Sequence, residues 1–262
     1  MQVDIYQKKV IVFDLDGTLA ETKSPIDQEM NRLLMELLKK KIVVVIGGGK
    51  YGLFKSQLID HLRAPTPLLR RLFLFPTTAT LFYRYLHGWK KIYELQLTKQ
   101  EKQTIHQAFQ QAFKEMGYVP PKKVYGPVIE DRGTQVTFSA LGQEIVAKLG
   151  PRGVALKKKW LDENKAVKIR LAKALQRHLP NLEVRAAGYT SIDITRKGLD
   201  KAFGIKQIQK NLHVTTAQMI FIGDALFPGG NDYAVRRTGV QCIAVSGPQQ
   251  TKQIIKSLIS NP

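Results

Sequence analysis

The sequence predicts an α/β protein with a parallel sheet, and two patterns along the chain support this prediction. Apolar, β-branched runs such as Val10 to Phe13 and Ile42 to Ile46 flank a helical pattern in the first part of the chain, and the last part repeats this order. A strand, a helix and a second strand within about 40 residues form a βαβ unit, whose strands are parallel. The middle of the chain alternates like antiparallel, half-exposed strands. We therefore expect a Rossmann-like, doubly wound parallel sheet core with an inserted α+β domain.

Length and composition are those of a globular protein. The chain has 262 residues, of which 44% are hydrophobic and 24% are charged, and a chain of this size can bury a core without disulfides. The single cysteine, Cys242, excludes an internal disulfide and a cysteine-based zinc site. Neither a secretory signal nor a window of about 18 apolar residues is visible. We therefore expect a cytoplasmic protein without a membrane span.

The predicted elements of the first part end in residues that suit the edge of a sheet. The strand over residues 10–13 runs into the segment Asp14-Leu15-Asp16-Gly17-Thr18. A helix is predicted to begin at Ser24-Pro25, because serine caps helices and proline suits the first turn. The run Ile42 to Ile46 is predicted to be a buried strand, and it ends in Gly47-Gly48-Gly49.

The remaining elements divide the chain into two parts. Strands are predicted over residues 91–97, 135–138, 182–187, 191–194, 219–222 and 242–245. Helices are predicted over residues 99–116, 164–179, 197–212 and 231–238, and from Gly247-Pro248 onward. We expect a core domain of residues 1–89 and 196–262 and an inserted α+β domain of residues 90–195.

Carboxylates follow two predicted strands of the core. Asp14 and Asp16 come directly after the first strand, and Asp224 follows the strand over residues 219–222, with Asp232 one glycine-rich loop later. Open α/β sheets place their sites at the carboxyl ends of parallel strands. Like charges repel, so carboxylates held together need a partner. Mg²⁺ prefers oxygen ligands and bridges to phosphate, so the pattern predicts a Mg²⁺ site.

The order and spacing of these motifs resemble the haloacid dehalogenase (HAD) superfamily over nearly the whole chain. The segment Asp14 to Thr18 resembles its first motif, Val45 to Gly49 the second and Gly198 to Lys201 the third. The segment Phe221 to Asp232 resembles the fourth motif, in the form found in eukaryotic-type phosphomannomutases. The segment Glu130 to Gly142 resembles a part of the cap of the same mutases, which implies a type IIB cap.

The resemblance implies roles for the carboxylates and for a lysine. Asp14 would attack phosphorus to form an aspartyl-phosphate, and Asp16 would act as general acid and base. Lys201 would neutralise charge beside the nucleophile, with Lys197 as a rival, since related enzymes place the lysine just before the glycine. The Mg²⁺ ligands that the resemblance implies are Asp14, Asp16 (through its carbonyl) and Asp224, with Asp232 in support.

The resemblance also implies substrate contacts, with several departures from the family pattern. Where the family offers a hydroxyl, this chain has Gly48 and Gly49, so either backbone N–H groups bind phosphate or the run is a simple turn. Of the arginines that bind a distal phosphate in the mutases, Arg132 is present, whereas Gln143 and Gly150 stand at two other positions. The substrate contacts that the resemblance implies are Lys23, Gly48, Gly49, Arg132, Gln143, Ser191 and Asp193.

These departures bear on the expected reaction. Losing arginine forks weakens phosphate binding at the far end of the substrate, although Lys148 or Arg152 could replace a contact. We expect a Mg²⁺-dependent phosphatase that hydrolyses a sugar phosphate or a similar small phosphomonoester. The alternative is a phosphomannomutase, which moves phosphate between sugar carbons by means of a bisphosphate. The related mutases often dimerise through the cap, so the resemblance is compatible with a homodimer.

The charge of the chain raises a third alternative. Lys+Arg 41 against Asp+Glu 21 gives a net charge of +20, which attracts anionic substrates or a nucleic acid. The densest run, Lys157-Lys158-Lys159, is expected to lie on a solvated helix face. Because no nucleic-acid-binding motif accompanies the charge, a polyanion or nucleic-acid binder on a HAD scaffold stays an alternative to the enzyme.

Overall fold

The computed structural model describes residues 5–260, and the chain forms two compact units. The core unit comprises Met1–Glu94 and Leu199–Pro262, and the inserted unit comprises Leu95–Gly198. Each unit has its own sheet and its own hydrophobic core.

The core unit is built around a seven-stranded sheet with the order β11-β10-β1-β2-β3-β4-β5. The pairs from β11 to β3 are parallel, whereas β4 and β5 add to the edge as antiparallel strands. The strands are β1 (Val10–Asp14), β2 (Ile42–Ile46), β3 (Leu72–Phe75), β4 (Leu81–Tyr85), β5 (Trp89–Glu94), β10 (Met219–Gly223) and β11 (Gln241–Ala244).

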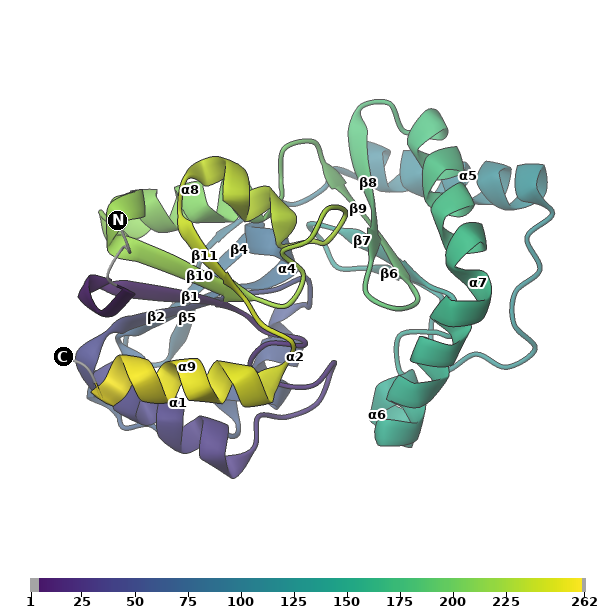
Figure 1. Cartoon of the computed structure of the whole chain (residues 1–262). Coiled ribbons are helices and arrows are strands. Elements are labelled where there is room, and N and C mark those ends of the chain that lie inside the picture. Colours follow the sequence, from purple (N-terminus) through teal and green to yellow (C-terminus); the bar gives the residue numbers. More distant parts are fainter. Residues whose placement is uncertain (1–4, 261–262) are drawn as a thin grey trace. The chain divides into compact units, whose positions relative to one another are not determined.

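Helices cover both faces of this sheet (Figure 1). The larger helices are α1 (Gln28–Lys40), α8 (Lys201–Leu212) and α9 (Pro248–Ser260). Helices α1 and α9 lie side by side on one face, where their apolar residues pack with Ile11 and Phe13 of β1. Helix α8 packs on the other face with Val10 and Val12 of the same strand. Apolar residues on both faces of one strand are typical of a sheet buried on both sides, which confirms the predicted doubly wound α/β core.

Short helical turns complete the core unit. They are η1 (Ile5–Gln7), α2 (Tyr51–Phe54), the π-helical turn η2 (Lys55–Ile59), α3 (Thr66–Leu69), α4 (Pro76–Ala79), η3 (Thr216–Gln218) and η4 (Tyr233–Thr238). The segment α4 is a left-handed turn, because Thr77, Thr78 and Ala79 all have positive φ angles.

The inserted unit is an antiparallel sheet with helices packed on its apolar face. The four-stranded sheet has the order β6-β7-β9-β8. Its strands are β6 (Ile129–Asp131), β7 (Val136–Ser139), β8 (Leu182–Ala187) and β9 (Ser191–Arg196), and its helices are α5 (Lys99–Met116), α6 (Ile145–Leu149) and α7 (Pro151–His178). Phe138 and Ile192 pack against Phe109 of α5 and Leu171 of α7. Thr137 and Asp193 alternate with these apolar residues and therefore belong to the opposite face.

One strand belongs to a different sheet from the one that its sequence suggested. The strand expected at the start of the insert is β5, and it pairs with β4 at the edge of the large sheet. A three-residue link, Leu86-His87-Gly88, joins the two strands, and Leu86 N donates to Gly88 O at 2.9 Å. Alternation identifies an antiparallel strand, but only its partner decides to which sheet it belongs.

Several helices begin at other residues than expected. Helix α8 begins at Lys201 rather than at residue 197, because Asp200 caps it, and the helix expected over residues 231–238 is the short turn η4. Helix α1 begins at Gln28, because Asp27 rather than Ser24 accepts the capping hydrogen bond, from Met30 N at 2.8 Å. Helix α7 begins at Pro151, well before residue 164, since the kink at Asn164 (φ −127°) interrupts the apolar periodicity from which the helix was predicted.

The basic run on α7 is only in part a solvated face. Lys158 and Lys159 are exposed, but Lys157 is 2% exposed, so the expectation was wrong for that residue. Among the helices of residues 5–260, none has both the length and the apolar character that crossing a membrane requires.

Candidate active site

The parallel strands of the core unit bring three carboxylates together. Asp14 is the last residue of β1, and Asp224 directly follows the neighbouring strand β10. Asp232 lies in the loop that leads into η4. Each of the three side chains offers an oxygen, and these oxygens all lie within 4.8 Å of one another. The expected meeting of these carboxylates at the carboxyl edge of the sheet is therefore present in the structure.

A buried lysine contacts two of these carboxylates. Lys201 is the first residue of α8 and is 1% exposed, and its Nζ contacts Asp14 Oδ1 and Asp232 Oδ1. Asp200 caps the helix by accepting from Phe203 N at 3.0 Å, which fixes the start of α8 beside the cluster. Lys197, the rival, is an exposed residue of the inserted unit. Lys201 is thus the lysine that faces Asp14.

The electrostatics of the cluster show a shortage of positive charge. Burial raises the pKa of Asp14 well above its ordinary value, although Lys201 opposes the shift. Burial, and after it the charge of Asp232, also raises the pKa of Asp224. Burial lowers the pKa of Lys201, but Asp14 and Asp232 outweigh it, so this pKa is raised and the ammonium stays charged. Three carboxylates against one ammonium fit a divalent cation with oxygen ligands.

The three carboxylates differ in what already occupies their oxygens. Asp232 Oδ1 contacts Lys201, and its Oδ2 accepts from Ala225 N at 3.0 Å. Both oxygens of Asp232 therefore have protein partners, and this carboxylate orients Lys201. Asp224 meets Thr18, whose Oγ1 accepts from Asp224 N at 3.1 Å and lies 3.4 Å from Asp224 Oδ1.

Asp16 is held apart from the cluster. Its Oδ1 accepts from Lys23 N at 2.6 Å and from Gln57 Nε2 at 3.0 Å. Within residues 5–260 the grouped carboxylates are Asp14, Asp224 and Asp232, so Asp16 is outside the group. A role of Asp16 toward a metal would therefore fall to its main-chain carbonyl. Lys23 meets Asp16 through its backbone, with a left-handed φ of 55°.

The glycine run after β2 forms part of a backbone turn. Gly47 O accepts from Thr78 N and Gly49 O accepts from Thr77 N, each at 2.9 Å. These bonds hold the left-handed turn α4, in which Thr77 has φ 47° and Thr78 has φ 56°. The sequence analysis did not predict the turn α4 beside Gly48 and Gly49. Threonine is β-branched and rarely adopts a positive φ, so nothing in the sequence indicated a left-handed turn there.

In the inserted unit, the predicted arginine and glutamine contact each other. Arg132 Nε lies 2.9 Å from Glu130 Oε2, and Arg132 Nη2 donates to Gln143 Oε1 at 3.1 Å. Gln143 Nε2 in turn donates to Thr137 O at 3.1 Å. The guanidinium that was expected to bind phosphate is thus paired with a carboxylate, and Gln143 orients it.

The predicted hydroxyl contacts lie on β9. Asp193 Oδ1 accepts from Thr137 Oγ1 at 2.8 Å, and Thr137 Oγ1 accepts from Gln135 Nε2 at 2.8 Å. Ser191 pairs in register with Ser139 of β7. Sequence reasoning missed Gln135 and Thr137, although the alternation of polar and apolar residues over 135–139 was a signal for one polar face.

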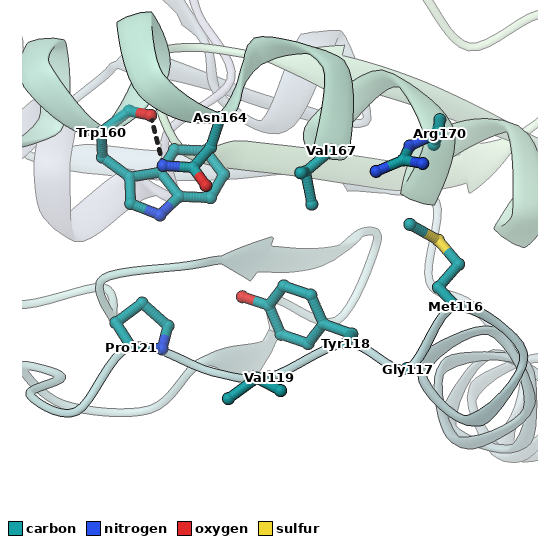
Figure 2. Close-up of a pocket in the computed structure, with 9 residues that line it drawn as sticks. All are labelled: Met116, Gly117, Tyr118, Val119, Pro121, Trp160, Asn164, Val167 and Arg170. Carbon is teal, nitrogen blue, oxygen red and sulfur yellow. Dashed lines mark hydrogen bonds between the residues drawn. The ribbon is translucent and has the colours of Figure 1, made fainter.

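The inserted unit also has a pocket of about 440 Å³, which contains none of the predicted site residues. Figure 2 shows it between the segment that follows α5 and one face of α7, with Tyr118 facing Trp160 across the gap. Asn164 Nδ2 donates to Trp160 O at 3.0 Å at the kink of the helix. The lining residues are Met116, Gly117, Tyr118, Val119, Pro121, Trp160, Asn164, Val167 and Arg170.

The sequence matches a known enzyme family over most of its length. Residues 11–235 match the family described as haloacid dehalogenase-like hydrolase. The chain therefore belongs to the haloacid dehalogenase-like hydrolases. This match confirms the predicted superfamily and the expectation of a phosphoryl-transfer enzyme.

Curated relatives resemble the whole chain at low identity. The chain is 25% identical over 250 residues to a phosphomannomutase of Encephalitozoon cuniculi, which covers 94% of this chain and 91% of that protein. It is 24% identical over 262 residues to a probable phosphomannomutase of Caenorhabditis elegans, with 96% of both chains covered.

A solved structure shares the fold. The N-terminally truncated IMP-nucleotidase of Plasmodium falciparum with bound IMP superposes with a TM-score of 0.69 and 16% identity. The match covers 97% of this chain and 68% of that chain. At this identity the likeness shows a common fold.

Proposed function

We propose that this enzyme is a Mg²⁺-dependent phosphatase that hydrolyses a sugar phosphate or a similar small phosphomonoester. The observation that carries this proposal is the contact of the buried Lys201 with Asp14 beside two further carboxylates. An isolated pair of this kind could be structural. Here the pair lies at the edge of the sheet, beside two further carboxylates whose charge a bound cation would neutralise. This combination suits phosphoryl transfer.

The proposed reaction has two steps, in which Asp14 first binds and then leaves phosphorus, and Asp16 acts first as acid and then as base. An oxygen of Asp14 forms a bond to phosphorus while the bond to the leaving oxygen breaks, and Asp16 gives that oxygen its proton. Water then attacks phosphorus, passes a proton to Asp16 and releases Asp14 and phosphate. Lys201 favours the ionised form of Asp14, against the effect of burial, and neutralises the charge beside it.

We further propose that Asp14, Asp224 and the main-chain carbonyl of Asp16 hold Mg²⁺. The cation, when bound, supplies positive charge to the phosphoryl oxygens. Asp232 takes part through Lys201, since both of its oxygens are occupied by protein donors. In the inserted unit, we propose that Arg132, Gln143, Ser191 and Asp193 contact the part of the substrate that leaves.

The second candidate is a phosphomannomutase, and the names of the curated relatives favour it. A mutase has to bind a phosphate at each end of its sugar. In this chain Gln143 and Gly150 stand where the resemblance expects arginines, and Arg132 is paired with Glu130. These features favour hydrolysis, because an unpaired guanidinium fork is the better phosphate ligand.

One assay separates the two candidates. Mannose 1-phosphate and glucose 1-phosphate are supplied with Mg²⁺, with and without a catalytic amount of a hexose 1,6-bisphosphate. Free phosphate without the bisphosphate supports the phosphatase. A 6-phosphate that forms only with the bisphosphate, and without free phosphate, supports the mutase. Asp14→Asn is the blank for both reactions.

A further inference from the structure

A buried glutamine of the core unit contacts the proposed acid and base. Gln57 lies in the π-helical turn η2 and is 1% exposed. Turns of this kind are rare, and they are frequently found at functional sites. Neither the sequence motifs nor the proposed mechanism gives this residue a task.

The hydrogen bonds of Gln57 determine the orientation of its amide. Its Nε2 donates to Asp16 Oδ1 and to Ser24 O, each at 3.0 Å. Both partners are acceptors, so the nitrogen has to face them, and a flipped amide would place an oxygen against two oxygens. The main chain of Gln57 also accepts from Ile26 N at 2.9 Å. Gln57 therefore ties the segment from Asp16 to Ile26 to the turn η2.

Two N–H donors converge on a single oxygen of Asp16. Lys23 N donates to Asp16 Oδ1 at 2.6 Å, beside the bond from Gln57. With two N–H donors aimed at it, Oδ1 faces no acceptor to which it could pass a proton. The proton that Asp16 gives up or takes is thereby assigned to Oδ2, and the plane of the carboxylate is held in one orientation.

The other end of the amide has no partner. Gln57 Oε1 is buried and has no hydrogen-bond partner among the residues that the structure describes. An unsatisfied buried acceptor costs free energy, so the contacts of the amide nitrogen have to hold this side chain in place. The nitrogen of the amide, which faces Asp16, is the part that makes contacts.

We propose that Gln57 is a positioning residue, which orients Asp16 so that Oδ2 delivers the proton to the leaving oxygen. This inference rests on the proposed phosphatase reaction. As the bond from phosphorus to the leaving oxygen breaks, the proton passes from Asp16 Oδ2 to that oxygen, and an alcohol departs. Gln57 itself stays unchanged and keeps its two hydrogen bonds.

The dependence of the rate on the leaving group tests this role. An alkoxide cannot leave without a proton, whereas a p-nitrophenolate can. In Gln57→Met, which keeps the volume but has no donor, kcat/KM for a sugar phosphate should fall about 10-fold or more, and kcat/KM for p-nitrophenyl phosphate less than about 3-fold. This quantity covers the steps up to departure of the leaving group, so the later attack of water does not obscure it.

Two further variants keep the test sharp. Gln57→Glu retains the shape of the side chain but places an acceptor beside Asp16, so the same selective loss is expected even if the methionine variant is unstable. Gln176→Met is the matched control, because Gln176 Nε2 likewise donates to two acceptors, the carbonyls of Leu179 and Leu182, at 2.9 Å each. Gln176 belongs to the inserted unit. For this variant, the ratio of kcat/KM between the two substrates should equal that of the wild type.

The outcomes distinguish this inference from the proposed function. An equal loss on both substrates, no loss, or a gain in the folded Gln57 variants would overturn the positioning role while leaving the phosphatase intact. A wild-type enzyme that releases phosphate from neither substrate would overturn the proposed function and this inference with it. A selective loss on the sugar phosphate supports both.

Discussion

Lys201 is the residue on which the candidate active site depends. Its buried ammonium contacts Asp14 and Asp232, and the cap at Asp200 fixes the start of α8 beside them. The lysine offsets only part of the charge of the cluster, because three carboxylates lie within 4.8 Å of one another. This imbalance is the physical reason to expect a bound cation.

Asp14→Asn tests the proposed nucleophile. An amide cannot form the aspartyl-phosphate, so phosphate release should fall by roughly 10³-fold or more, while the circular dichroism spectrum and Tm stay close to those of the wild type. Asp162→Asn, at an exposed position of α7, is the control and should keep full activity. Substantial turnover by Asp14→Asn would remove Asp14 as the nucleophile.

Gly17 is a residue of the site at which the backbone limits the choice of side chain. Its φ is +87°, and a Cβ there would lie 2.5 Å from Asp224 Oδ2. Gly17→Ala should lower the free energy of unfolding by about 1–2 kcal/mol and displace Asp224. Urea unfolding measures the first effect, and the Mg²⁺ dependence of the rate measures the second.

Gly52→Ala is the matched control for this substitution. Gly52 lies in the helical turn α2, and a Cβ at this position has nothing within 4 Å. Its stability should stay equal or rise by up to about 1 kcal/mol, because alanine narrows the unfolded ensemble. Equal effects at Gly17 and Gly52 would contradict the account given for Gly17.

At the scale of elements, the start of α5 joins a capping box to an ion pair. Thr98 accepts from Glu101 N at 3.1 Å, and Glu101 accepts from Thr98 N at 2.6 Å. The Glu101 carboxylate also accepts hydrogen bonds from Nε and Nη2 of Arg196 in β9, each at 2.8 Å. The side-chain hydrogen bond from Arg196 holds the pKa of Glu101 at about 2. This helix end is therefore tied to the sheet of the inserted unit.

Glu101→Gln should destabilise the protein in a pH-dependent way. The folded pKa of about 2 lies below the ordinary value of 4.5, so the folded state binds fewer protons. The contribution, about 1 kcal/mol for a partly exposed pair, is complete above that ordinary value and disappears as the pH falls toward 2. Unfolding curves at pH 7 and pH 3.5 should show a smaller difference between the variant and wild type at pH 3.5. Glu163→Gln is the control, because it loses only an exposed ion pair with Lys159. Its stability should equal that of the wild type at both pH values.

At the scale of the whole molecule, the net charge of +20 should act on the encounter with an anionic substrate. Long-range attraction raises the rate of association and is screened beyond about 10 Å at 0.1 M salt. We expect kcat/KM for a phosphomonoester to fall several-fold between 0.05 and 0.5 M NaCl, with kcat nearly constant. A kcat/KM that does not depend on salt would show that the charge serves another purpose, such as binding a polyanion.

The sequence by itself determined the α/β architecture and the place of the carboxylates. Buried β-branched runs with helical patterns between them form parallel strands covered by helices. In this arrangement the backbone hydrogen bonds of the strands are satisfied within the sheet. Asp14 and Asp224 follow such runs, so the sequence placed both of them at the carboxyl edge of the sheet. Where local patterns decide, as along α5, the predicted residues 99–116 are those of the structure.

Only the tertiary structure decided which residues meet across long separations in the chain. The sequence left Lys197 and Lys201 as rivals, and the position of α8 against β1 brought Lys201 to Asp14. Nothing in the sequence pointed to Gln57, because its bond to Asp16 depends on how η2 packs against a loop 41 residues away. The edge strand β5 likewise carries the alternation of an antiparallel strand in either sheet. Periodicity records which face a residue is on, whereas the partner on that face is decided by packing.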